Sequence, residues 1–194
     1  MTDSHVDLWW LPVRAGGRVV IHTSRWWELM RARGEHRAPQ PLFHAALEVI
    51  VDERPHLIKM TPAWGVPTTS HGVVASGPVG ARWLGRSRFF RYEIRCWPDG
   101  ILPDPAWAID SPVRFALPQV EARALLARVS TVPTPTWGRD AFRCGDMWNS
   151  NSLVSWLLQT SGIDATRIRP PGDGRAPGWA SGIALRFGAV QAGR

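Results

Sequence analysis

The chain has 194 residues, of which 44% are hydrophobic and 20% are charged, a composition typical of one folded domain rather than a disordered chain. Its formal net charge is +7, carried almost entirely by arginine, with Lys59 as the single lysine. The arginines concentrate only in residues 82–95, with no zinc pair, helix-turn-helix or RNA-recognition motif, so we do not expect nucleic acid as a partner. An anionic small substrate would suit the same charge.

The sequence shows no targeting or membrane signal. The first 17 residues carry two aspartates and lack a basic run and a long apolar core, so we expect no signal peptide. No apolar stretch approaches about 18 residues, so we expect neither a membrane span nor a membrane partner. Only two cysteines occur, Cys96 and Cys144, which favours a reducing, cytoplasmic setting over a disulfide scaffold.

The first half of the chain shows strand and helix signals in alternation. Residues 18–22 predict a short strand, and residues 24–33 a helix with Ser24 as its cap. The apolar, β-branched run 42–51 predicts a strand that pairs as a hairpin with residues 56–64.

In the second half, the glycine-rich residues 65–80 predict a loop and the alternating residues 87–97 a strand. Residues 118–132 predict an amphipathic helix, because their apolar residues follow the spacing i, i+3, i+4, i+7. A further helix is expected at about 151–161, followed by an irregular stretch over 168–182. The apolar positions of the amphipathic helix are Ala122, Leu125, Leu126 and Val129.

This order of elements predicts an α+β fold in which an antiparallel sheet packs against helices. We expect residues 1–194 to form a single domain, with its core at about 18–174 and an irregular C-terminal tail.

A polar box, Asn149-Ser150-Asn151-Ser152, runs directly into the second helix. A serine at a helix N-terminus suits a nucleophile, because unpaired N–H groups and the positive end of the helix dipole stabilise the anion of acyl transfer. The alternative is that the serine only caps the helix, which is the commoner role of Ser and Asn at such positions. Asn149, Asn151 and the preceding Trp148 are the residues expected to support a substrate or an oxyanion.

The second residue of interest is His44, which interrupts an otherwise apolar strand. A buried imidazole needs a partner, and a serine hydroxyl needs a base to become a nucleophile. A single strand histidine is more often structural than catalytic, so the two residues become a candidate pair only if the fold brings them together.

The order of a strand histidine, further strands and then a nucleophile at a helix start resembles the circularly permuted papain-like hydrolases of the NlpC and lecithin:retinol-acyltransferase types. Their box is similar to N-C-N-(S/T)-(L/F), with cysteine where this chain has Ser150. A closer likeness is to an uncharacterised bacterial family whose box, G-P-N-S-N-T-F, already has serine. His44, the segment RYEI at 91–94 and the segment RPPGDG at 169–174 resemble further landmarks of that family.

The resemblance implies a permuted papain-like fold, with Ser150 as the nucleophile and His44 as the general base. Glu93 fits best as the third member, although a solvent-facing strand glutamate is the alternative. Glu48 shares a strand face with His44 but lies about 13 Å along the strand, too far for a hydrogen bond. Two other histidines, His56 and His71, stay open as orienting groups.

Serine in place of cysteine allows three interpretations: a true serine acyl hydrolase, a degenerate site, or an inactivated Cys-to-Ser variant. Cys144 is the rival nucleophile, although it lacks a helix start of its own. We expect no metal and no cofactor, because neither metal-ligand spacing nor a phosphate-binding loop occurs.

These observations favour two functions over a third, a basic protein that binds nucleic acid or an acidic partner. The first is a hydrolase or acyltransferase acting on an amide, ester or thioester of a small-molecule or peptide substrate. The second is a catalytically degenerate papain-like module that binds a small acidic or aromatic ligand, since the chain has 12 tryptophans that suit an aromatic cleft.

Overall fold

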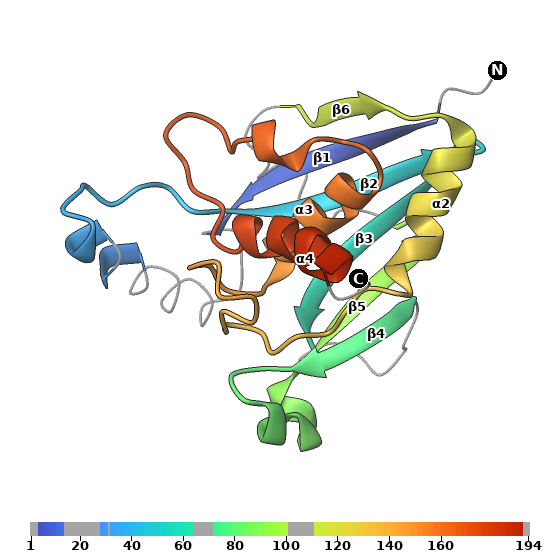
Figure 1. Cartoon of the computed structure of the whole chain (residues 1–194). Coiled ribbons are helices and arrows are strands. Elements are labelled where there is room, and N and C mark those ends of the chain that lie inside the picture. Colours follow the sequence, from blue (N-terminus) through green and yellow to red (C-terminus); the bar gives the residue numbers. More distant parts are fainter. Residues whose placement is uncertain (1–3, 14–27, 31, 64–71, 101–110, 192–194) are drawn as a thin grey trace.

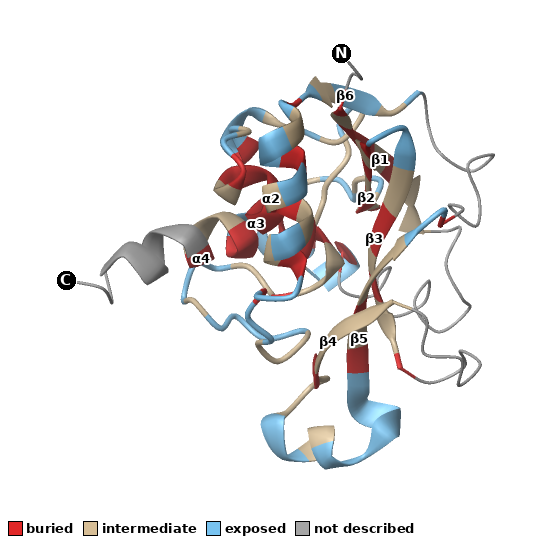
Figure 2. Ribbon diagram, turned by 90° about the vertical axis from the view of Figure 1, so that its right-hand side faces the viewer, coloured by how far each residue is buried: buried red, intermediate tan, exposed pale blue. Residues whose placement is uncertain are grey.

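The computed structural model describes residues 4–13, 28–30, 32–63, 72–100 and 111–191, and side chains as far as Leu185. In these ranges six strands form one open antiparallel sheet in the order β4-β5-β3-β2-β1-β6. The helices α2, α3 and α4 lie together on one face of this sheet (Figures 1 and 2). The α+β class with an antiparallel sheet is therefore confirmed. The strands are β1 (His5–Pro12), β2 (Phe43–Val51), β3 (Arg54–Pro62), β4 (Val73–Pro78), β5 (Arg91–Pro98) and β6 (Val113–Ala116), and the helices are α2 (Gln119–Val129), α3 (Ser150–Thr160) and α4 (Trp179–Gln191).

The hairpin of β2 and β3 forms as the sequence predicts. Its turn consists of Asp52 and Glu53, which adopt positive φ angles of 53° and 63°. Two consecutive residues with positive φ make the tight turn whose twist matches that of the flanking strands. This turn sets the register, in which Val51 pairs with Arg54 and Leu47 with Ile58.

The register decides which side chains of β2 enter the core. Phe43, Ala45, Leu47, Val49 and Val51 are buried in the cluster that also contains the apolar residues of α2 and α3. Since successive side chains of a strand point to opposite faces, the residues between them, His44 among these, project from the face that the helices do not cover.

The predicted amphipathic helix forms as α2, and Ala122, Leu125 and Val129 are fully buried on its inner side. α3 is more deeply enclosed, because every residue from Asn151 to Gln159 is buried. Its partner α4 lies close enough for the Ser155 hydroxyl to donate to the Trp179 carbonyl at 2.7 Å. Gly182 makes this approach possible, since a Cβ there would overlap the Ser152 carbonyl and the Ser155 hydroxyl.

Several expectations about the elements were wrong. Residues 73–78, expected in a loop, form strand β4 at the edge of the sheet, and the tail becomes helical from Trp179. Neither β1 nor β6 was predicted. The predicted strand at 18–22 lies outside the described residues, as does the first part of the helix at 24–33, of which residues 28–30 and 32–34 are helical.

Within the described ranges, no helix combines the length and apolar character that crossing a bilayer requires. The same part of the chain contains no group of three or more His, Cys, Asp or Glu side chains placed to hold a metal ion.

Candidate active site

The start of α3 is closed by a capping box. The cap residue is Asn149, whose backbone is extended and whose Oδ1 accepts hydrogen bonds from the amides of Asn151 at 2.9 Å and Ser152 at 3.4 Å. In return, the Ser152 Oγ accepts a hydrogen bond from the Asn149 amide at 3.0 Å. This is the reciprocal pattern that satisfies the first N–H groups of a helix. Ser150 is therefore the first residue inside the helix, and the interpretation of Ser150 as its cap is wrong.

Asn151 fixes the first turn of α3 to β2. Its Oδ1 accepts a hydrogen bond from the Ala45 amide at 2.7 Å, and its Nδ2 donates to the Phe43 carbonyl at 3.0 Å. These two peptide groups flank His44. A second donation from Nδ2 to the Pro177 carbonyl, at 2.8 Å, uses the remaining hydrogen of the amide. The carboxamide of Asn151 is thus committed to the fold and has no N–H left for an oxyanion.

The Asn151 side chain replaces a missing strand. β3 pairs with β2 from Arg54 to Ile58, whereas residues 59–62 of β3 pair with β5 alone. The open edge of β2 is bound by the carboxamide of Asn151 and by Arg175, whose carbonyl accepts a hydrogen bond from the Phe43 amide at 2.8 Å. The first turn of α3 is therefore bonded to this edge of the sheet, at the strand position of His44.

The neighbouring polar residues also serve the scaffold. Asp146 accepts hydrogen bonds from the amides of Gly178 at 2.7 Å and Ala180 at 3.1 Å, which caps the start of α4. The Ser152 hydroxyl donates to the Gly178 carbonyl at 2.7 Å. Trp148 is fully buried, and its indole N–H donates to the Tyr92 hydroxyl at 3.2 Å.

Ser150 differs from these neighbours. It is half-buried, and neither its hydroxyl nor its backbone N–H has a hydrogen-bond partner among the described residues. A hydroxyl and an N–H of the same residue, both open at a helix N-terminus, are the pair that acyl-transfer enzymes use as nucleophile and oxyanion donor. The backbone N–H groups of Trp148, Asn149 and Asn151, the residues expected to support an oxyanion, are all bonded within the fold. The free backbone N–H among the described residues of the box is that of Ser150.

His44 is half-buried on β2. Burial, together with the positive charge of Lys59 on β3, lowers the pKa of His44 to about 4. The ring is therefore neutral at pH 7 and able to accept a proton. Within the described part of the chain the ring has no hydrogen bond, so the structure brings the backbones of β2 and α3 together at His44 without joining its side chain to that of Ser150.

Glu93 lies on the same face of the sheet as His44, because it pairs with Thr61 and alternates with the buried Tyr92 and Ile94. Its carboxylate accepts hydrogen bonds from Arg95 Nη2 at 2.7 Å and Nε at 3.2 Å. Glu93 thus shares a face with His44 but is bonded to Arg95.

The other candidates lie elsewhere. His56 pairs with Val49, far along β2 from His44, and His71 lies outside the described residues. Partial burial and the carboxylates of Asp140 and Asp146 raise the pKa of the exposed Cys144 thiol. A raised pKa disfavours the thiolate, so Cys144 is a poor rival nucleophile.

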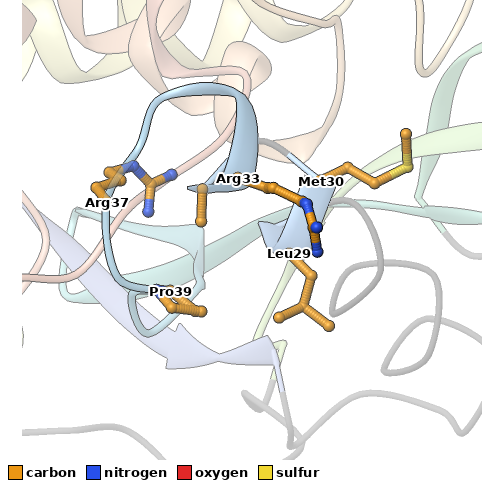
Figure 3. A pocket seen from close by; sticks show the side chains of 6 residues that line it. Leu29, Met30, Arg33, Arg37 and Pro39 are labelled. Carbon is orange, nitrogen blue, oxygen red and sulfur yellow. The ribbon is translucent and has the colours of Figure 1, made fainter.

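An open hollow of about 470 Å³ lies on the segment that precedes β2 (Figure 3). Leu29, Met30 and Arg33 face Arg37 and Pro39 across it, and Ala32 completes its lining. The lining of the hollow includes none of the residues predicted from the sequence to form the site, such as Ser150, His44 and Glu93. The buried Glu28 holds its rim through Arg37 Nη1 at 2.5 Å.

A comparison of the chain with protein-family models, with curated proteins and with solved structures finds no match.

Proposed function

We propose that the protein is a hydrolase or acyltransferase that acts on an amide, ester or thioester through Ser150 as nucleophile and His44 as base. The observation that carries this proposal is the Asn151 carboxamide, which binds the peptide groups on both sides of His44. Nothing in helix capping requires this bond, since Asn149 and Ser152 already close the helix. These two bonds fix the first turn of α3 against the backbone of His44, whose side chain lies on the face of the sheet that the helices do not cover. Catalysis by the pair would require the imidazole to reach Ser150 around the open edge of β2.

In the proposed reaction, the Ser150 Oγ attacks the carbonyl carbon of the substrate while His44 takes the hydroxyl proton. The Ser150 N–H donates to the resulting oxyanion. The imidazolium then returns the proton to the leaving group, which departs as the acyl-serine forms. Water, or a second nucleophile, releases the acyl group by the same steps, and the choice between them distinguishes hydrolysis from transfer.

The permuted papain-like arrangement is part of the same proposal. Two features support it: the backbone around a strand histidine is bonded to the first turn of a later helix, and helices cover one face of the antiparallel sheet. In this arrangement Glu93 is the proposed third member, because it lies on the same face of the sheet as His44.

A specific observation favours the second candidate, a degenerate binding module. The described residues give Ser150 and His44 no hydrogen bond to each other, and Glu93 is occupied by Arg95. In that case the residues at the start of α3 would bind a ligand without forming an acyl-enzyme.

Covalent labelling separates the two candidates. The full chain is incubated with a fluorophosphonate probe, and the modified residue is located by mass spectrometry. The enzyme proposal expects an adduct on Ser150 that is lost in Ser150→Ala and strongly reduced in His44→Ala. Ser130→Ala is the matched control, because Ser130 is an exposed serine at the end of α2. An unlabelled Ser150 in a protein with native circular dichroism would overturn the enzyme and leave the binding module.

A further inference from the structure

The connection between β4 and β5 forms a lobe, residues 79–91, that projects from the edge of the sheet (Figure 1). It consists of two 3₁₀ turns, η2 (Arg82–Arg86) and η3 (Arg88–Phe90), neither of which contains a buried residue. Its surface is mostly exposed (Figure 2). Three aromatic side chains in it face solvent, namely Trp83 at 72%, Phe89 at 74% and Phe90 at 44% exposure.

The lobe is also strongly basic. Residues 79–92 contain four arginines and no aspartate or glutamate. Arg82, Arg86 and Arg88 have no carboxylate partner in the described part of the chain, whereas Arg91 donates to the Ser76 hydroxyl at 3.1 Å. Uncompensated positive charge and exposed aromatic rings therefore share one short protruding segment.

We propose that this lobe docks on an anionic lipid surface. Tryptophan and phenylalanine rings enter the boundary between head groups and acyl chains, while arginines beside them bind lipid phosphates. The charge of the lobe is complementary to that surface. A nucleic-acid strand would instead need a groove that follows its backbone, and the hollow described above lies on residues 29–39, not on the lobe.

The base of the lobe is held firmly against the body of the protein. The Val79 amide donates to the Phe90 carbonyl at 2.8 Å, and the Gly80 amide donates to the Trp137 carbonyl at 3.0 Å. Arg139 Nε donates to the Gly80 carbonyl at 2.6 Å. The lobe is thus presented in a fixed orientation, as a docking element requires.

The same base reaches the loop that leads into α3. The Gly138 amide donates to the Trp148 carbonyl at 2.9 Å, and the Trp148 amide donates to the Arg139 carbonyl at 2.9 Å. Docking through the lobe would therefore also fix the loop before Ser150 relative to the lipid surface. Such docking would be contact with a membrane surface and not a membrane span.

The test is sedimentation of the full chain with two kinds of vesicle, pure phosphatidylcholine and phosphatidylcholine with 30% phosphatidylglycerol. We expect binding to the anionic vesicles alone, weakened at least tenfold in Trp83→Ala/Phe89→Ala. Arg82→Gln/Arg86→Gln/Arg88→Gln should weaken it about 100-fold. The controls are Val120→Ala, which removes an equally exposed apolar side chain from α2, and Arg167→Gln, which removes an exposed arginine; both should bind as the wild type does.

Two results would overturn the proposal. One is the absence of binding to anionic vesicles, or binding that the lobe variants leave unchanged while their circular dichroism is native. The other is lobe-dependent binding of a single-stranded oligonucleotide without binding to vesicles, which would assign the lobe to nucleic acid instead.

Discussion

The Oδ1 of Asn151 accepts a hydrogen bond from the Ala45 amide at 2.7 Å, and this bond joins residues that are 106 positions apart in the chain. The bond satisfies a backbone amide of β2 beyond Leu47, where the pairing of β2 with β3 ends. The candidate site thus depends on a side chain that acts as a piece of β-sheet, which explains why the box residue after Ser150 is an amide and not simply a good helix former.

Replacing Asn151 with Ala should lower the free energy of unfolding by about 3 kcal/mol, because the buried Ala45 amide and Phe43 carbonyl would both lose their partner. Asn151→Asp is the informative comparison: it keeps an acceptor for Ala45 but has no N–H for Phe43 or Pro177. Urea unfolding followed by circular dichroism measures both. If Asn151→Ala were as stable as the wild type, the hydrogen bonds of Asn151 to Ala45 and Phe43 would not be needed for stability.

Two serines of α3 should respond in opposite ways. Ser150→Ala should change the free energy of unfolding by less than about 0.5 kcal/mol, since its hydroxyl has no partner in the described residues. Ser152→Ala should cost about 2 kcal/mol, because the Ser152 Oγ bonds the Asn149 amide and the Gly178 carbonyl. The same urea titrations apply. Equal losses in the two variants would mean that Ser150 also supports the fold.

His44 makes stability depend on pH. Burial and the charge of Lys59 lower its pKa from 6.5 to about 4. Between pH 6.5 and pH 4 the His44 ring therefore binds a proton in the unfolded chain but not in the folded protein. The contribution of His44 is complete above pH 6.5 and is lost as the pH falls towards 4, by about 3 kcal/mol in all.

The measurement is the difference in unfolding free energy between the wild type and His44→Gln from pH 7 to pH 4, which cancels the effect of the carboxylates common to both. Titration of the His44 ring by NMR gives the folded pKa directly. A midpoint near 6.5 would contradict the burial of this ring. If His44 is the base, labelling of Ser150 should persist down to pH values well below 6.

Local patterns predicted the elements whose sequences carry their own signal. The β2–β3 hairpin and α2 have clear apolar periodicity, and both were found within a few residues of their predicted ends. β4 was missed because it is an edge strand that contains Ser76, Gly77 and Pro78, residues typical of turns; its pairing with β5 comes from tertiary contacts alone. α4 was missed since its glycines mask a helix that is stabilised by packing on α3.

For the site, the sequence identified the helix start but not the division of roles within it. Asparagine and serine both suit helix caps and hydrogen bonds to backbone groups, and serine also suits a nucleophile. Only the fold shows that Asn149 caps α3 and that Asn151 bonds the backbone of β2. For Glu93 a local signal did exist: Arg95 follows two residues later on the predicted strand, a spacing that places both side chains on one face, where they form an ion pair.

The packing of α4 on α3 gives a final prediction. Gly182→Ala should destabilise the protein by about 2 kcal/mol, because a Cβ at this position would overlap the Ser152 carbonyl, a backbone atom that moves only with the helix. Gly34→Ala is the matched control: this glycine is also helical and has no atom within 4 Å of an added Cβ, so the same change should be neutral or stabilise by up to about 1 kcal/mol. Thermal unfolding of the two variants measures the contrast. Helix propensity alone would favour alanine at both positions, so a stabilised Gly182→Ala variant would mean that the two helices do not pack this closely.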